Sequence, residues 1–262
     1  MHTKDLQNIG NSLYRELSPL RHSSRMKDSE GTGAGGDKTY HIDRLAEEII
    51  ISSLEALHEP LTVISEEAGI VPLHGGGKTV LLDPIDGSRN AVHGIPFYGT
   101  SIAVAAGPSV GDLYLAYIIN LVNDDAFWAE RDQKAFFLGN SMQCQVEEEL
   151  SFVAYEAAAP SRDLPPIVPL LSAAKKVRCL GATALDLAYV ACGAVSAFVT
   201  ASASRTFDFA GGYLLMKEAG GIVTDMQGNA LDRLELELKQ TTSLLAAGNA
   251  GLHKKAVALL NR

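Results

Sequence analysis

The chain has 262 residues, 47% of them hydrophobic and 20% charged, with no long low-complexity tract, as is typical of a globular protein. This length suits one large domain or two closely packed halves. The net charge is −9 and no cluster of Lys and Arg is longer than a pair, which argues against nucleic acid or an anionic membrane as the main partner.

The sequence also gives no sign of secretion or membrane insertion. Residues 1–17 are polar and amphipathic, unlike a signal peptide. Residues 187–203 are weakly apolar but interrupted by glycine and hydroxyl side chains, which favours a buried helix followed by a strand over a membrane span. Cys144, Cys179 and Cys192 are odd in number and far apart, which indicates neither a disulfide framework nor a zinc site. We therefore expect a cytoplasmic protein.

The first half of the chain predicts two helices and then a series of strands. Apolar residues recur at intervals of three and four over residues 4–20 and 42–57, which predicts two amphipathic helices. Between them, the Ser/Gly-rich stretch near residues 23–37 contains a bare GxGxxG pattern without a preceding strand, so we expect a mobile loop and no dinucleotide site. Short β-rich runs follow at 61–65, 79–83, 99–107, 113–120, 126–130 and 135–140. The last four are separated by turn residues alone, which predicts an antiparallel sheet.

After the acidic residues 147–149 the pattern changes to strands that alternate with helices. The predicted strands are 151–155, 176–180, 196–200, 221–225 and 243–248. The predicted helices are 166–174, 182–192, 207–219 and 251–260. Such alternation indicates layered αβ structure, and we expect the two halves to meet near residues 140–155.

The segment DPIDGSRN, residues 83–90, follows the apolar run TVLL and carries two aspartates three residues apart. Asp83 would end a strand, and after the turn at Pro84 the side chain of Asp86 can return to the same side, so both carboxylates can reach one pair of cations. The N–H groups of Gly87 and Ser88 could open a helix whose N-terminus binds phosphate. A simple acidic turn in which Asp86 caps a helix fits the same residues.

Other acidic residues also stand at the predicted ends of elements. Glu66 and Glu67 follow the strand 61–65, where a solvated turn is the alternative; Asp43 and Asp208 each open a helix, where a cap is the alternative. Together with DPIDGS they predict a site where several elements meet. An acidic protein that handles phosphate needs another source of positive charge, and divalent metal held by carboxylates supplies it.

Three segments, VISEEAG, TVLLDPIDGSRN and RTFDFAGGYLLMKEAGGIVTD, resemble in order and spacing the metal-binding signatures of the inositol monophosphatase family. The start GTGAGGDKTYHID and the serine in DPIDGS are most similar to the archaeal-type branch, whose members often hydrolyse both inositol monophosphate and fructose 1,6-bisphosphate. The resemblance implies an α+β fold, an αβαβα sandwich of the sugar phosphatase type. Residues 1–145 would hold two helices, the antiparallel sheet and most metal ligands; residues 146–262 would hold a mixed sheet and the last metal aspartate. It also implies a homodimer.

The resemblance further implies two or three Mg²⁺ ions, with Mn²⁺ as a possible substitute, and inhibition by lithium. The implied ligands are Glu66, Asp83, the carbonyl of Ile85, Asp86 and Asp208. Glu67 and Asp37 would support a weaker third metal. Two metals about 3.5–4 Å apart can stabilise both the attacking and the leaving oxygen of a phosphoryl displacement.

Catalytic and substrate-binding roles are implied in the same way. Glu66 is assigned to catalysis with Ser88 and Asp43, the last two as a hydroxyl and carboxylate pair that orients and deprotonates water. The implied substrate-binding residues are Asp86, Gly87, Ser88, Arg178, Thr183 and Arg205. Both arginines would meet a second phosphate, although a surface ion pair is the alternative for Arg205. The position at which inositol-preferring relatives carry a glutamate is Ala201 here.

These features predict a Mg²⁺-dependent phosphomonoesterase of a small polyol or sugar phosphate, with inositol monophosphate and fructose 1,6-bisphosphate as the leading substrates. A nucleotide 3′-phosphatase acting on adenosine 3′,5′-bisphosphate is one alternative. A catalytically silent relative that serves as an interaction protein is another.

Overall fold

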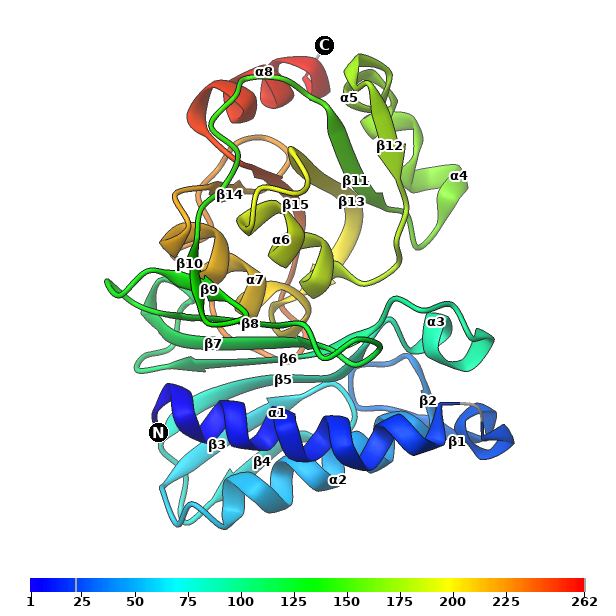
Figure 1. The fold of residues 1–262 in the computed structure, drawn as a ribbon, viewed down its shortest axis with the longest axis vertical. Helices are drawn as coiled ribbons and strands as arrows, with labels where there is room; N and C mark the ends of the chain where they lie inside the picture. Colours follow the sequence, from blue (N-terminus) through cyan, green and yellow to red (C-terminus); the bar gives the residue numbers. More distant parts are fainter. Residues whose placement is uncertain (22, 262) are drawn as a thin grey trace.

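The computed structural model describes residues 1–21 and 23–261 (Figure 1). Its first half places two helices on one face of an eight-stranded sheet: α1 (Thr3–Leu17) and α2 (His41–Glu55). The strands are β3 (Leu61–Ser65), β4 (Gly69–Leu73), β5 (Lys78–Asp86), β6 (Gly99–Ala105), β7 (Leu113–Asn120), β8 (Ala126–Glu130), β9 (Ala135–Phe137) and β10 (Asn140–Met142). Their spatial order is β10-β9-β8-β7-β6-β5-β3-β4, and every neighbouring pair except β3 and β5 is antiparallel.

The second half builds a mixed sheet with helices on both faces. Its strands are β11 (Phe152–Glu156), β12 (Lys176–Arg178), β13 (Ala197–Arg205), β14 (Ile222–Thr224) and β15 (Thr241–Ala247), in the order β12-β11-β13-β15-β14. Strand β11 is parallel to β12 and β13, whereas β15 is antiparallel to β13 and β14. Helices α6 (Thr183–Ala191) and α7 (Thr206–Glu218) lie between the two sheets, and α4 (Pro160–Asp163), α5 (Val168–Ala173) and α8 (Ala250–Leu260) lie outside.

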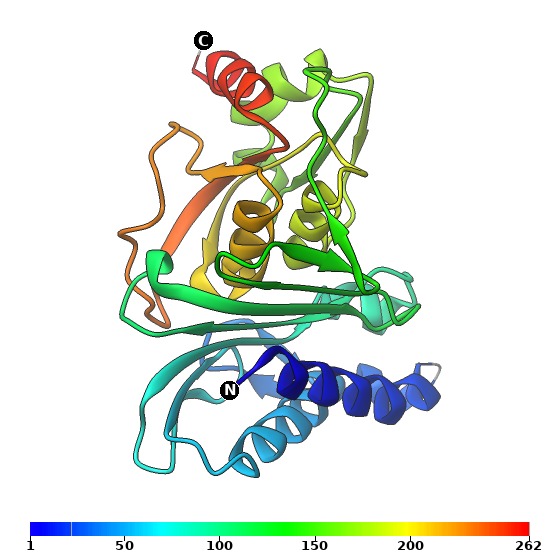
Figure 2. The same ribbon diagram turned by 60° about the vertical axis from the view of Figure 1, so that its left-hand side comes forward.

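Both views show the same succession of layers, helices, sheet, helices, sheet, helices (Figures 1 and 2). The predicted α+β class and αβαβα sandwich are therefore confirmed. Three apolar cores hold the layers together: one lies between α1, α2 and the first sheet, one surrounds α6 and α7 between the two sheets, and one lies between the second sheet and the outer helices. In β5, Val80 and Leu82 face the core under α1 and α2, whereas Leu81 faces the core around α6 and α7, because successive strand residues point to opposite faces. A strand buried on both faces is apolar throughout, as the run TVLL is.

Several details differ from the sequence expectation. The stretch 135–140 is a hairpin rather than one strand, because Leu138 (φ 48°) and Gly139 (φ 83°) form a turn between β9 and β10. The Ser/Gly-rich segment is also more structured than a mobile loop, since β1 (Ser29–Thr32) pairs with β2 (Lys38–Tyr40). The N–H groups of Ala34 and Gly35, at the tip of this hairpin, donate to the carbonyls of Glu67 and Glu66.

The remaining elements are short. Helix α3 (Ser88–His93) follows β5 directly and ends at Gly94, whose φ of 76° suits a C-terminal cap. The 3₁₀ turns are η1 (Ser18–Leu20), η2 (Ser24–Lys27), η3 (Val110–Asp112) and η4 (Pro165–Ile167). Within the described ranges, no helix has the length and apolarity required to cross a membrane.

Candidate active site

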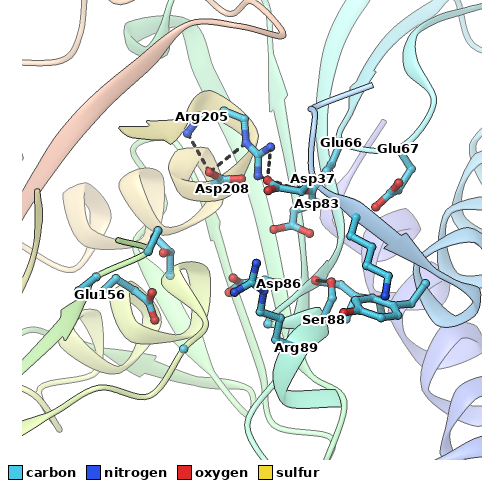
Figure 3. Close-up of a pocket in the computed structure, with 18 residues that line it drawn as sticks. Asp37, Glu66, Glu67, Asp83, Asp86, Ser88, Arg89, Glu156, Arg205 and Asp208 are labelled. Carbon is cyan, nitrogen blue, oxygen red and sulfur yellow. Dashed lines mark hydrogen bonds and ion pairs between the residues drawn. The ribbon is translucent and has the colours of Figure 1, made fainter. Parts of the chain in front are cut away.

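A cavity of about 350 Å³ opens where the elements of the two halves meet (Figure 3). It is lined by the end of the β1–β2 hairpin, the turn after β3, the end of β5 with the start of α3, the end of β11, the loop before α6, and the start of α7. The lining residues are Asp37, Lys38, Tyr40, Glu66, Glu67, Asp83, Ile85, Asp86, Gly87, Ser88, Arg89, Glu156, Ala157, Ala158, Gly181, Thr183, Arg205 and Asp208. The volume is within the range of pockets that bind small molecules.

Strand ends bring the predicted acidic residues together in this cavity. Strands β3 and β5 are parallel neighbours, so Glu66, directly after β3, lies beside the end of β5 that carries Asp83 and Asp86. Asp208 is the third residue of α7, the helix that packs against the same sheet from above. Figure 3 shows the carboxylates of Asp83, Asp86 and Asp208 gathered around a common space.

Burial and mutual repulsion raise the pKa values of these carboxyl groups. Desolvation raises the pKa of Asp83 well above its usual value, and the charges of Glu66 and Asp86 raise it further. The pKa of Asp86 is raised to about 8, first by desolvation and then by the charge of Asp208. Desolvation also raises the pKa values of Glu66 and Asp208. A cluster of carboxyls that repel one another in a cavity is typical of a functional site.

Asp86 also caps a helix, as the alternative interpretation of the motif allowed, but the helix is α6 rather than α3. Its Oδ2 accepts hydrogen bonds from the N–H groups of Ala184 (2.7 Å) and Leu185 (3.3 Å). The cap fixes the end of β5 against the second half of the chain. The two interpretations of Asp86 are therefore compatible.

Arg205 is the cation at the centre of the acidic cluster. Its guanidinium lies 2.7 Å from Glu66 Oε1, 2.7 Å from Asp37 Oδ2 and 3.5 Å from Asp208 Oδ2 (Figure 3). A further hydrogen bond to the carbonyl of Gly35 (3.0 Å) joins Arg205 to the β1–β2 hairpin. Arg205 therefore forms an ion pair, as the alternative interpretation predicted, but the pair lies in the cavity and not on the surface.

Ser88 and Asp43 are neighbours beside the cluster. The Ser88 hydroxyl donates to the carbonyl of Ile85 (2.8 Å), while Asp43 Oδ1 is buried and has no hydrogen-bond partner among the described residues. Burial raises the pKa of Asp43 to about 7, and the adjacent Ser88 hydroxyl partly opposes this rise. A rotation of the hydroxyl from Ile85 toward Asp43 would complete the predicted pair.

Gly87 and Asn90 determine how α3 starts. Gly87 has a φ of 88°, and a Cβ there would lie 3.0 Å from the carbonyl of Gly181, so glycine suits both the backbone and the close approach. The first N–H groups of α3 have no acceptor within the helix, so they remain able to bind an anion. Asn90 donates to the carbonyls of Phe97 and Leu180, each at 2.7 Å, and so joins α3 to the loop before α6.

Not all of the residues predicted to bind the substrate line the cavity. Thr183 lines the cavity, whereas Arg178 is not among its lining residues in the described chain. The Arg178 side chain is exposed, lies over the ring of Phe152 and donates to the Val177 carbonyl, because β12 is an edge strand. Ala201 packs against the outer core under α5 and α8 and does not line the cavity either, again within the described chain.

The donor set suits a hard divalent cation. The cavity offers carboxylate and carbonyl oxygens, and Asp83 Oδ1 is buried without a hydrogen-bond donor among the described residues. Oxygen ligands of this kind favour Mg²⁺ or Mn²⁺ over zinc. In residues 1–21 and 23–261, however, no three His, Cys, Asp or Glu side chains are arranged closely enough to ligate one ion as they stand. Metal binding would therefore require the carboxylates around Arg205 to rearrange.

Sequence comparison establishes the family. The model of the inositol monophosphatase family matches residues 6–262. The chain belongs to the inositol monophosphatase family. A fructose-1,6-bisphosphatase/inositol-1-monophosphatase of Methanothermobacter thermautotrophicus is 34% identical to it over 96% of this chain and 94% of the relative. This likeness matches the archaeal-type branch and identifies the chain as a phosphatase, a phosphoric monoester hydrolase.

Similar proteins also carry other names. A bifunctional NADP phosphatase/NAD kinase of Methanococcus maripaludis is 29% identical over 96% of this chain, which corresponds to 48% of that longer protein. The solved structure of extragenic suppressor protein suhB from Bartonella henselae superposes with a TM-score of 0.86 at 26% identity, covering 99% of this chain and 98% of that one. Proteins similar to this chain thus differ in name, so its substrate depends on the residues of its own cavity.

Three charged residues of the cavity were not assigned from the sequence. Lys38 and Arg89 are exposed at the edge of the cavity, and Glu156 ends β11 inside it. Glu156 carries a signal that could have been used, because it is an acidic residue at the carboxyl end of a predicted strand, as are Glu66 and Asp83. The basic residues carry no such signal, since single exposed Lys and Arg side chains are common everywhere.

Proposed function

We propose that this member of the inositol monophosphatase family is a Mg²⁺-dependent phosphomonoesterase of a small polyol or sugar phosphate. The observation that carries the proposal is the meeting of Glu66, Asp83, Asp86 and Asp208 in one cavity, with a buried and unpartnered oxygen on Asp83 among the described residues. Inositol monophosphate and fructose 1,6-bisphosphate are the leading substrates, since the relative from Methanothermobacter thermautotrophicus is named for both activities.

The residues that would hold the metal are the four carboxylates and the carbonyl of Ile85, with Glu67 and Asp37 in support. When bound, Mg²⁺ or Mn²⁺ would supply positive charge to the phosphate and acidify water. Glu67 is buried and accepts a hydrogen bond from Thr39, so it is held in place, whereas Asp37 is exposed and pairs with Arg205. We propose two or three ions, with lithium as an inhibitor, in line with the family resemblance.

The chain's own groups would orient the reactants. Asp43, whose pKa is raised to about 7, is suited to accept a proton near neutral pH through the Ser88 hydroxyl. The N–H groups of Gly87 and Ser88 at the start of α3 would hold phosphate oxygens, with Asp86 beside them. Thr183 would contact the sugar or polyol. Arg205 would contact phosphate only after release from its carboxylates, and Arg178 is not among the residues that line the cavity in the described chain.

A nucleotide phosphatase is the second candidate. The relative from Methanococcus maripaludis is named an NADP phosphatase, and this chain matches about half of it. A nucleotide that carries a phosphate on its ribose, such as adenosine 3′,5′-bisphosphate or NADP, would then be the substrate. A silent interaction protein would have little use for a buried acidic cluster, which is costly for stability.

Phosphate release from a substrate panel tests the proposal. Purified protein would be assayed with Mg²⁺ or with a chelator on inositol 1-phosphate, fructose 1,6-bisphosphate, adenosine 3′,5′-bisphosphate and NADP. We expect release that depends on Mg²⁺, with the highest kcat/KM on one of the first two. Mg²⁺ binding without release from any of these substrates would contradict the proposal. We further propose a cytoplasmic homodimer, by likeness to the family, and light scattering of the purified protein would test the dimer.

A further inference from the structure

Glu156 is a cavity carboxyl group without an evident structural task. The other acidic side chains of the cavity have partners: Glu66, Asp37 and Asp208 contact Arg205, Asp86 caps α6, and Glu67 accepts from Thr39. Asp83 is a proposed metal ligand. Glu156 makes no ion pair and no hydrogen bond to another side chain among the described residues, and its Oε1 is shielded from solvent and has no partner there.

Such a group lowers stability unless a ligand uses it. A buried carboxyl oxygen without a donor, such as Glu156 Oε1, costs free energy because it loses water and gains no hydrogen bond in return. Desolvation raises the pKa of Glu156, and the nearby N–H groups of Ala157 and Gly181 oppose the rise. These amides hold the carboxyl at the end of β11, on the side of Asp86 away from Ser88 in Figure 3. Glu156 therefore faces the part of a bound ester that lies beyond the phosphate.

The surroundings of Glu156 indicate which chemical groups it can accept. Its neighbours in the cavity wall are Ala157, Ala158, Gly181 and Thr183, which carry no charge. Close to it, Asp186 is fully buried with both carboxyl oxygens unpartnered among the described residues, and burial together with the charge of Glu156 raises its pKa well above the usual value, so Glu156 is the group of this wall that can carry the negative charge. Hydroxyl groups of a polyol can donate to a carboxylate here, whereas a second phosphate would meet negative charge.

The cations of the cavity lie elsewhere. Arg205 is bound to the acidic cluster, Arg178 is outside the cavity lining, and Lys38 and Arg89 belong to the β1–β2 hairpin and α3, at the end where the phosphate is expected. We propose that Glu156 is a specificity-determining residue that accepts hydrogen bonds from the hydroxyls of a polyol monophosphate and disfavours a second phosphate at the same place. This assignment rests on the proposed phosphatase function and selects inositol monophosphate over fructose 1,6-bisphosphate.

A comparison of three substrates distinguishes this role from a general loss of activity. The variants Glu156→Ala and Glu156→Gln would be compared with the wild type and with the control Glu48→Gln, an exposed position on α2. The substrates are inositol 1-phosphate, fructose 1,6-bisphosphate and p-nitrophenyl phosphate, whose leaving group has no aliphatic hydroxyl. Loss of a hydrogen bond to a charged group predicts a KM for inositol 1-phosphate raised about tenfold or more in Glu156→Ala and less in Glu156→Gln.

In the same variants, kcat/KM for p-nitrophenyl phosphate should stay near the wild-type value. The ratio of kcat/KM for fructose 1,6-bisphosphate to that for inositol 1-phosphate should rise in Glu156→Gln, because the charge is removed. Equal losses on all three substrates, or an unchanged KM for inositol 1-phosphate, would overturn the role of Glu156 while leaving the phosphatase function in place. A wild type that releases phosphate from none of them would overturn the proposed function, and this assignment with it.

Discussion

Replacement of Asp83 by asparagine should raise the stability of the metal-free protein and abolish its activity. Asp83 is 3% exposed, its Oδ1 has no donor among the described residues, and burial together with Glu66 and Asp86 raises its pKa. In the presence of a chelator the wild type must keep this group protonated or keep an unpaired charge buried. Asp83→Asn removes that penalty and adds an N–H donor for the neighbouring carboxylates.

Removal of a buried unsatisfied charged group is worth about 1–3 kcal/mol or more, and a chain of this size gains about 2–4 °C in Tm for each kcal/mol. We therefore expect Asp83→Asn to melt several degrees above the wild type in chelator. With Mg²⁺ the order should reverse, because a ligand at 100 times its Kd stabilises the wild type by about 2.7 kcal/mol and the variant has lost a ligand.

Differential scanning fluorimetry with and without Mg²⁺ measures both effects, alongside phosphate release. The exposed Asp132→Asn serves as the matched control and should behave as the wild type in each buffer. A variant that melts below the wild type in chelator and still gains the full stabilisation from Mg²⁺ would refute the reasoning that Asp83 is a buried metal ligand.

Other predictions concern the cation of the cluster, pH and packing. Arg205→Gln should lower the Tm in chelator, since loss of one partner from a buried ion pair costs about 3–5 kcal/mol. Mg²⁺ should restore most of the lost stability. Equal losses of Tm in both buffers would contradict a role of Arg205 inside the acidic cluster. In chelator, stability should fall as pH rises from about 4 to about 8. The reason is that the pKa values of Asp43 (raised to about 7) and Asp86 (raised to about 8) lie above those of the unfolded chain, so the folded state holds more protons over this range. A Tm that rises with pH over the same range would contradict these shifts. Gly212→Ala should destabilise the protein by about 1–3 kcal/mol in urea unfolding, since a Cβ there would lie 2.5 Å from Leu187 Cδ1 between α6 and α7, whereas Ala194→Gly, in the loop after α6, should cost less.

The sequence indicated which acidic residues would lie close together, and these residues line one cavity, because the signals that mark them are local. Asp83 and Glu66 each follow an apolar run at the end of a strand, and two parallel strands that end together bring such residues side by side. Strand ends could be placed closely from alternation and turn residues, as for 61–65, 113–120 and 126–130, which coincide with β3, β7 and β8.

The substrate-binding residues were harder to predict from the sequence, because their role depends on the direction in which single side chains point. Arg178 was expected in the pocket. However, its strand β12 is at the edge of the sheet, and the Arg178 side chain lies over the ring of Phe152. Ala201 faces the outer core because the pattern of β13 puts alternate residues on opposite sides of the sheet. Glu156 was missed since one glutamate after a strand resembles many others until β11, β5 and α6 are assembled.

We propose that the four carboxylates hold the metal that phosphate hydrolysis requires. The most direct measurement is the release of phosphate from inositol 1-phosphate by the wild type and Asp83→Asn, each with Mg²⁺ and with chelator. We expect turnover only for the wild type with Mg²⁺, and background rates in the other three reactions. A near-normal rate for Asp83→Asn, or for the wild type in chelator, would contradict it.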